Sequence, residues 1–285
     1  MMTLASVLNT MGITSSRITP FLPYDTGESF LLTTDGADAL ATWYGLRRAA
    51  PRTGFWPILL GDVDSYRAHD DHLRAILRKN GSNHVPVTSR ITRSLAIDPL
   101  GWFRLHAQHH DRHSQSAYAA HEPPFVAQND RVMLDAAPPV WRLQSDPYMV
   151  ERNTFAIPTE VLSPHADDTD AHMRIQPAPI VYLALLPTQT AWHIPAYLDY
   201  GGVNDSPSVD GQLLVWRWWK SQYHAEIVGI AGNGIEAWVV APPRDPQRSA
   251  RLAWEHEVYC PDVITQVNDL PTDVTDAFVW RFWWN

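Results

Sequence analysis

The stretch Phe278-Val-Trp-Arg-Phe-Trp-Trp-Asn285 carries five large aromatic side chains among its eight residues. Aromatic side chains of this size stabilise a protein when they are buried in a core or held against a partner. The stretch belongs to a region, residues 180–285, that holds nine of the 13 tryptophans and the single cysteine. We therefore predict that residues 278–284 form a strand that completes a β-sheet.

Apolar runs bounded by turn residues predict three further strands in this region, at 180–186, 225–230 and 235–240. Gly232-Asn-Gly234, between the last two strands, is typical of a β-hairpin. Ser208 and Asp245 can each cap a helix, and the apolar spacing after them predicts helices 208–223 and 245–259. The resulting α+β order, β-α-β-β-α-β, predicts a ferredoxin-like (split βαβ) sheet with both helices on one face.

Residues 1–160 are predicted to form a smaller N-terminal α/β region with irregular proline-rich segments. Residues 1–28 are expected to be irregular because Pro20 and Pro23 interrupt them. Strands are expected at 29–34 and 55–60, with Pro57 placing the second towards an edge or bulge.

Helices are expected at 36–49, 65–79 and 99–119. Residues 131–134 and 140–143 are candidate strands. Residues 161–178 are expected to be a linker or crossing loop, and 179–285 a C-terminal domain.

Composition bounds the class of protein. The chain is 45% hydrophobic and 19% charged, as globular proteins are, and its formal net charge of −9 argues against nucleic-acid binding. It has no signal peptide and no apolar run long enough to span a membrane, so we expect a cytoplasmic protein without membrane contact. No glycine-rich nucleotide motif is present, so no cofactor is expected.

One candidate catalytic set lies at the end of the last predicted helix. Glu255, His256, Cys260 and Asp262 combine carboxylates, an imidazole and a thiol, which could support nucleophilic or acid–base chemistry. A helix C-terminus raises the pKa of a thiol, however, so a buried structural cysteine before a proline stop is the favoured interpretation.

Histidines suggest a candidate metal site. His106, His109 and His113 share one face of the predicted helix 99–119, a spacing that suits zinc, nickel or copper. No carboxylate completes a metalloprotease motif, so a solvated polar helix is the favoured alternative.

The candidate binding residues fall in a loop and among the tryptophans. Asn204 and Asp205 follow a glycine pair ahead of a helix, where backbone amides could hold an anion, although a simple turn is favoured. Trp219, Trp283 and Trp284 could contact a partner. Adjacent strand residues face opposite sides, so either Trp283 or Trp284 should lie in the core and the other on an outer face or against the N-terminal part.

Several stretches of the C-terminal part share the sequence pattern of one domain family. They are Pro195-Ala-Tyr-Leu198, Gly201-Gly-Val-Asn-Asp205, Trp216–Gly229, Ile235–Pro243, Glu255-His256, Tyr259-Cys-Pro-Asp262, Gln266 and Phe282-Trp-Trp-Asn285. Through them, residues 192–285 resemble the bacterial domain of unknown function 4253, and Arg52–Leu60 resembles an earlier segment of such proteins. Relatives often carry a cysteine where this chain has Ser206, which weakens any scheme with two cooperating thiols. The resemblance implies toxin–immunity and similar accessory loci, and it supplies no catalytic residues.

We expect a protein-binding accessory protein, and the leading hypothesis is an immunity protein that neutralises a cognate toxin by occlusion. Acidic charge, surplus aromatics and the resemblance favour a protein partner, with a basic toxin as the candidate. One alternative, less favoured, is a hydrolase or transferase that uses the Glu255, His256, Cys260 and Asp262 set. Another is a structural or assembly module, including a homo-oligomer formed through a strand edge.

Overall fold

The structure is a computed structural model, and it describes residues 4–13, 17–80, 85–110, 122–123, 179–202, 204–231, 234–261 and 274–284. The candidate strands at 131–134 and 140–143 and the expected linker at 161–178 lie outside the described residues. Among the described residues, no helix is both long and apolar enough to cross a membrane.

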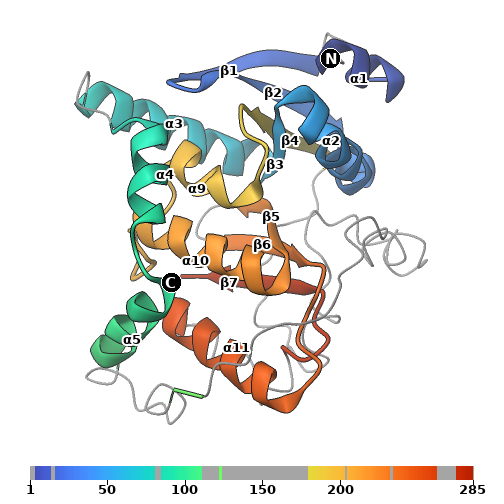
Figure 1. The fold of residues 1–285 in the computed structure, drawn as a ribbon. Coiled ribbons are helices and arrows are strands. Elements are labelled where there is room, and N and C mark those ends of the chain that lie inside the picture. The colour runs from blue at the N-terminus through green and yellow to red at the C-terminus, as the bar shows by residue number, and fades with distance from the viewer. Residues whose placement is uncertain are drawn as a thin grey trace.

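One mixed sheet of seven strands organises the described residues, in the order β1-β2-β4-β3-β5-β6-β7 (Figure 1). The strands are β1 (Ile18–Tyr24), β2 (Gly27–Asp35), β3 (Trp56–Gly61), β4 (Ile180–Leu186), β5 (Ala225–Ala231), β6 (Gly234–Val239) and β7 (Val279–Trp283). Neighbouring strands pair antiparallel except β3 and β5, which run parallel. The sheet therefore takes strands from both sides of the expected linker.

Strand β3 lies inside the sheet, between β4 and β5, and all six of its residues are buried. Pro57 was expected to place this strand at an edge or a bulge; the edge position was wrong, and the one register shift in its pairing with β4 lies between Leu59 and Gly61 and not at Pro57. The carbonyl oxygen of Pro57 accepts a hydrogen bond from the Trp43 indole at 3.1 Å. In a strand, the N–H and C=O of one residue point to the same side. The side of Pro57 that lacks an N–H is therefore the side on which its C=O meets the Trp43 side chain, so no strand-to-strand hydrogen bond is lost there.

The ferredoxin-like order is not found, although the mixed α and β class is confirmed. In that arrangement the last strand would lie beside the first, but β7 pairs with β6, with Trp283 opposite Gly234 and Val279 opposite Trp238. Strand β4 is instead flanked by β2 and β3. The order differs because β3, from the N-terminal part, takes the position between β4 and β5.

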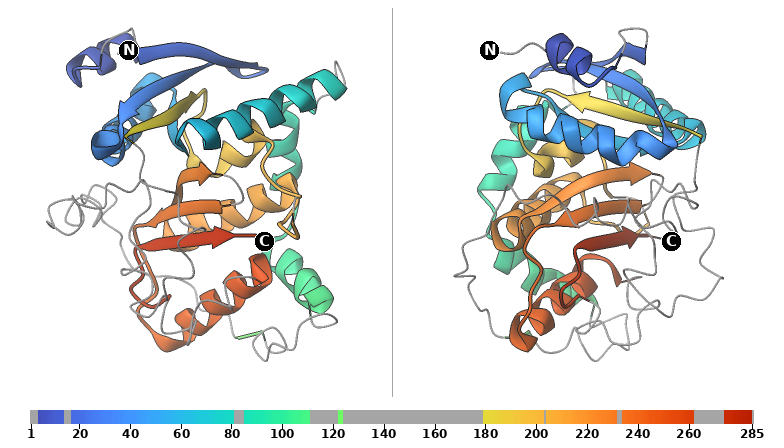
Figure 2. Two further views of the ribbon diagram at one scale, coloured as in Figure 1. Left: turned by 180° about the vertical axis from the view of Figure 1, so that it is seen from behind. Right: turned by 90° about the vertical axis from the view of Figure 1, so that its right-hand side faces the viewer.

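Helices cover both faces of the sheet (Figure 2). The helices of eight or more residues are α2 (Ala39–Thr53), α3 (Val63–Asn80), α4 (Val87–Leu95), α5 (Pro99–His110), α10 (Val209–Tyr223) and α11 (Pro246–Tyr259), and the shorter ones include α1 (Leu4–Thr10) and α9 (Ile194–Leu198). Helices α1 and α2 pack on one core cluster with Leu32, Leu59 and Trp238. Helices α10 and α11 pack together on the opposite cluster, which confirms that these two helices share a face.

The predicted caps of the two C-terminal helices, α10 and α11, are confirmed. The Ser208 hydroxyl accepts a hydrogen bond from the Gly211 amide at 3.3 Å, and the Asp245 carboxylate accepts one from the Arg248 amide at 2.9 Å. Such bonds satisfy amides that a helix start leaves without partners. The start of α2 differs from the expectation, because a short 3-10 turn at 36–38 precedes it and Asp35 forms no side-chain cap.

The N-terminal residues are more regular than expected. Helix α1 and strand β1 lie within the segment expected to be irregular. Strand β1 tolerates Pro20 and Pro23 because it is an edge strand that pairs only with β2, and its register shifts between these two prolines.

Candidate functional site

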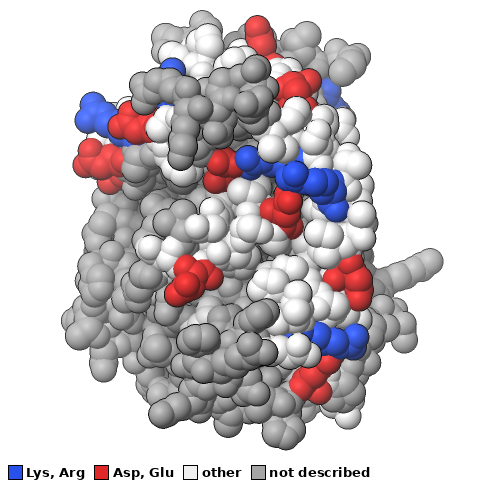
Figure 3. Space-filling view, turned by 90° about the vertical axis from the view of Figure 1, so that its left-hand side faces the viewer, with Lys and Arg blue, Asp and Glu red and all other residues white. Residues whose placement is uncertain are grey.

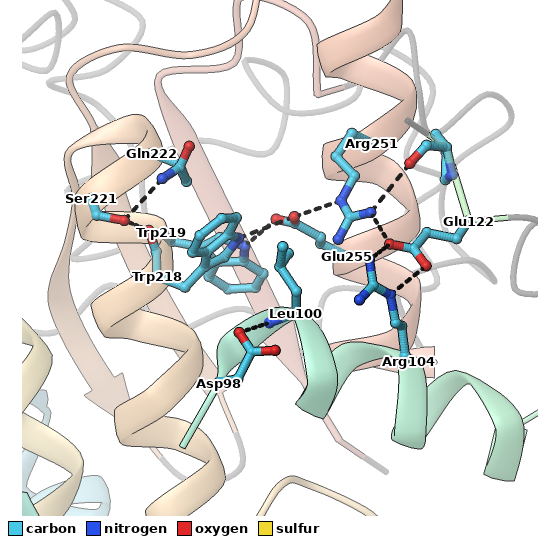
Figure 4. Close-up of polar contacts among 11 residues, drawn as sticks. Asp98, Leu100, Arg104, Glu122, Trp218, Trp219, Ser221, Gln222, Arg251 and Glu255 are labelled. Atoms are coloured by element: carbon cyan, nitrogen blue, oxygen red, sulfur yellow. Dashed lines mark hydrogen bonds and ion pairs between the residues drawn. The ribbon is translucent and has the colours of Figure 1, made fainter. Parts of the chain in front are cut away.

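Glu255 lies at the centre of the cluster that the sequence singled out, and its side chain is fully buried on α11. Its Oε1 atom accepts hydrogen bonds from the Trp218 indole at 3.0 Å and from Arg251 Nε at 2.9 Å (Figure 4). Its Oε2 atom accepts one from the Trp219 indole at 2.9 Å. The carboxylate therefore joins α11 to α10 through three donors, as a buried charge requires.

Arg251 and Glu255 form an ion pair, and further charged side chains extend it from the core to the surface. Arg251 Nη1 lies 2.7 Å from Oε1 of Glu122, whose Oε2 accepts from Arg104 Nε of α5 at 2.8 Å (Figure 4). The Arg251 guanidinium also stacks 4.4 Å from the Trp254 ring. Burial raises the pKa of Glu255 despite the opposing effects of Arg251 and the two indoles. The pKa of Glu122 is lowered, chiefly by its hydrogen bond to Arg104.

His256 faces the aromatic core. Its ring centroid lies 4.6 Å from that of Trp280, 4.8 Å from that of Phe282 and 5.0 Å from that of Trp219. Burial lowers its pKa to about 3, because loss of contact with water disfavours the charged form. It is therefore a neutral imidazole near pH 7.

Cys260 ends α11 and is fully buried. Its thiol donates to the Trp283 carbonyl oxygen at 3.0 Å, which ties the helix end to β7. Asp262 lies outside the described residues. Glu255, His256 and Cys260 are therefore all buried, and their described polar and ring contacts are with core groups of α10 and of the β7 segment.

The tryptophans expected to contact a partner are buried in this structure. Trp219 is 0% exposed, Trp284 2% and Trp283 9%. The predicted alternation of β7 is found, because Trp280, Phe282 and Trp284 face the cluster with α10 and α11 while Val279 faces the other cluster. Little of the surface of the three candidate tryptophans is accessible in this structure, and a partner contact at these three residues stays a prediction.

The loop around Asn204 packs against the strand that ends the sheet. Asn204 and Asp205 both have left-handed backbones, with φ of 48° and 61°. The Asn204 side-chain amide lies 3.5 Å from the Trp284 carbonyl oxygen, and Asp205 is exposed. A side chain on Gly201 would meet the Pro207 carbonyl oxygen at 2.4 Å, so the turn needs glycine there.

Sequence reasoning missed a pocket of about 330 Å³ between α2 and the start of β5. Its polar centre is Glu226, 1% exposed, which accepts from Arg47 Nε at 2.7 Å and Arg47 Nη2 at 2.9 Å. Lys220, in the last turn of α10, lies 2.5 Å from the same carboxylate. Burial alone would raise the pKa of Glu226, but Arg47 and Lys220 hold it below its usual value. A glutamate inside the apolar run 225–230 was the available signal.

One domain-family model matches the C-terminal part of the chain. Residues 182–285 match the model described as Domain of unknown function (DUF4253). The match begins within β4 and contains α10, α11 and β7, so the Glu255 cluster lies inside the DUF4253 region. No curated protein and no solved structure matches the chain.

The histidines expected to bind metal lie before the DUF4253 region, on and beyond α5. His106 Nδ1 lies 2.9 Å from the Trp102 carbonyl oxygen, and its ring stacks on Trp102 with centroids 3.7 Å apart. The side chain of His109 and all of His113 lie outside the described residues. Within the described part of the chain, no group of three possible metal ligands is found.

Proposed function

We propose that this protein binds another protein and acts as an accessory factor, with an immunity protein that occludes a basic toxin in the cytoplasm as the specific form. The observation that carries this proposal is the exposed apolar surface on α4 and α5. Five large hydrophobic side chains are exposed among the described residues, and three of them, Leu95, Ile97 and Leu105, fall within eleven residues. They lie at the end of α4, in the connection that follows it and within α5, and exposed apolar surface favours a protein contact.

The charges beside these side chains support a contact of mixed character. Arg93 of α4 pairs with Asp210 of α10 at 3.1 Å, and Arg217 donates to the Ile97 carbonyl oxygen at 2.9 Å. Figure 3, which views the side where α4 and α5 lie in Figure 1, shows acidic and basic side chains interspersed with uncharged surface. The overall charge of −9 would still attract a basic partner over longer distances.

The test is binding to the product of the neighbouring gene. We expect the two purified proteins to bind at micromolar concentration in calorimetry, and the double variant Leu95→Ser/Leu105→Ser to bind at least tenfold more weakly. Val63→Ser/Ile180→Ser is the matched control, because Val63 and Ile180 are exposed to 36% and 51% in other elements. No binding by the wild type, or equal losses in both variants, would contradict the proposal.

A further inference from the structure

The pocket at Glu226 has an excess of positive charge. Among the described residues, the charged side chains that line it are Arg47, Arg48, Lys220 and Glu226. Three positive charges and one negative charge leave a net of +2, in a chain whose formal net charge is −9. Like charges brought together cost free energy unless something offsets them, so a cationic pocket on an acidic protein points to an anionic ligand.

The Glu226 carboxylate accepts hydrogen bonds from two of the three cationic side chains. Glu226 holds Arg47 through two hydrogen bonds and Lys220 through one, which fixes both side chains at the wall of the pocket. Arg48 is exposed, and its guanidinium carbon lies 5.9 Å from the centre of the Tyr44 ring. Arg48 lines the pocket and, among the described residues, forms no ion pair.

The remaining walls suit the rest of a small molecule. Pro51 and the rings of Tyr44 and Trp56 supply apolar surface, and Gln189 and Thr190 supply neutral polar groups. A volume of about 330 Å³ suits a small organic ligand. Tyr44, Pro51 and Trp56 precede the DUF4253 region, whereas Gln189 and Thr190 belong to it. The pocket is therefore formed only where the N-terminal part meets the DUF4253 region.

We propose that this pocket binds a small organic anion, a phosphate or carboxylate carried on an apolar or aromatic group. The anionic group lies between Arg48 and Lys220, where planar and point-charge donors meet it from two elements. The apolar part lies against Tyr44 and Pro51. This site is independent of the protein contact proposed for α4 and α5, because the two share no residue.

Calorimetric titration of the full chain tests the proposal with four probes. Phenyl phosphate and benzoate carry the anion on a ring, phenol lacks the anion, and inorganic phosphate lacks the ring. We expect phenyl phosphate or benzoate to bind at millimolar concentration or below and more weakly as NaCl is added, and phenol not to bind. Preference between the two ring anions identifies phosphate or carboxylate as the group selected. Inorganic phosphate that binds as tightly as phenyl phosphate would overturn the apolar part of the proposal.

A matched pair of variants locates the binding. Arg48→Ala should weaken binding of the preferred probe roughly tenfold or more, the usual effect of losing a charge-assisted hydrogen bond. Arg52→Ala removes the same charge from an exposed position on the same helix, outside the pocket lining, and should leave binding unchanged. Circular dichroism checks that both variants are folded. Equal weakening in both variants, or no binding of either ring anion by the wild type, overturns the proposal.

Discussion

Arg251 and Glu255, one turn apart on α11, form an ion pair inside the core, with 2.9 Å between Arg251 Nε and Glu255 Oε1. Their side chains are 2% and 0% exposed. Both indole donors to the same carboxylate come from α10, at Trp218 and Trp219. The pair therefore links the two helices, and we expect its loss to lower the free energy of unfolding.

Neutralising Glu255 should strongly destabilise the protein. Glu255→Gln leaves Arg251 with the partly exposed Glu122 in place of its fully buried counter-charge, and losing one partner of a buried pair typically costs about 3–5 kcal/mol. Urea unfolding followed by tryptophan fluorescence measures the change in unfolding free energy. The control is Asp276→Asn, which breaks the exposed pair with Arg244 and should cost less than about 1 kcal/mol. Similar losses in both variants would contradict a structural role for the buried pair.

Stability should fall in acid because of His256. The pKa of this histidine is about 3 when folded, against an ordinary value of 6.5, so the unfolded chain binds a proton that the folded one does not. Its contribution is complete above pH 6.5 and is lost progressively as the pH falls towards 3. Between pH 7 and 5 the loss should be about 2 kcal/mol.

The variant His256→Phe should remove this part of the pH dependence, because phenylalanine does not titrate. Unfolding free energies at pH 7, 6 and 5 should therefore decline less steeply in His256→Phe than in the wild type. His72→Phe is the matched control at an exposed position of α3, and its slope should equal that of the wild type. His193, whose pKa burial lowers to about 4, contributes a similar slope to all three proteins.

Local signals predicted the elements better than their arrangement. Ser208 and Asp245 cap their helices as expected, because a cap depends only on residues within one turn. The position of β3 depends on strands more than a hundred residues away, and the partner that tolerates Pro57 is Trp43 of α2. The sequence carries no local sign of either contact.

In the candidate site, too, local features could be predicted from the sequence and long-range contacts could not. Glu226 in an apolar strand indicates a buried charge, but its partner Arg47 lies 179 residues away, so the pocket could not be predicted. The tryptophans stood out by number, yet number alone does not separate core from surface. The alternation of strand faces predicted that one of Trp283 and Trp284 lies in the core without saying which, and the structure places Trp284 there.

Cys260 should resist thiol reagents in the native protein. Its side chain is fully buried and its thiol donates to the Trp283 carbonyl, so labelling requires opening of the α11–β7 contact. We expect Ellman's reagent to release stoichiometric thiolate in urea and very little without it. As a control, Ser221→Cys in a Cys260→Ala background presents a thiol at an exposed site and should react at once. Rapid native labelling of Cys260 would revive the catalytic hypothesis.

The aromatic strand should be indispensable to the fold. Phe282 is 0% exposed, and Trp284 lies 5.3 Å from the Tyr259 ring and 6.3 Å from the Tyr200 ring. Deleting residues 282–285 removes both aromatics from the core, at about 3–5 kcal/mol each, which matches the whole stability of an ordinary domain. We expect the truncated chain to show no cooperative thermal unfolding by circular dichroism.

A single substitution separates packing from a role in binding. Trp284→Ala should lower the unfolding free energy by about 3–5 kcal/mol. Trp192→Ala, at a partly buried tryptophan before α9, should lower it less, because less apolar surface leaves the core. If Trp284→Ala keeps wild-type stability and loses only partner binding, the strand acts as an anchor and its burial in the core is wrong.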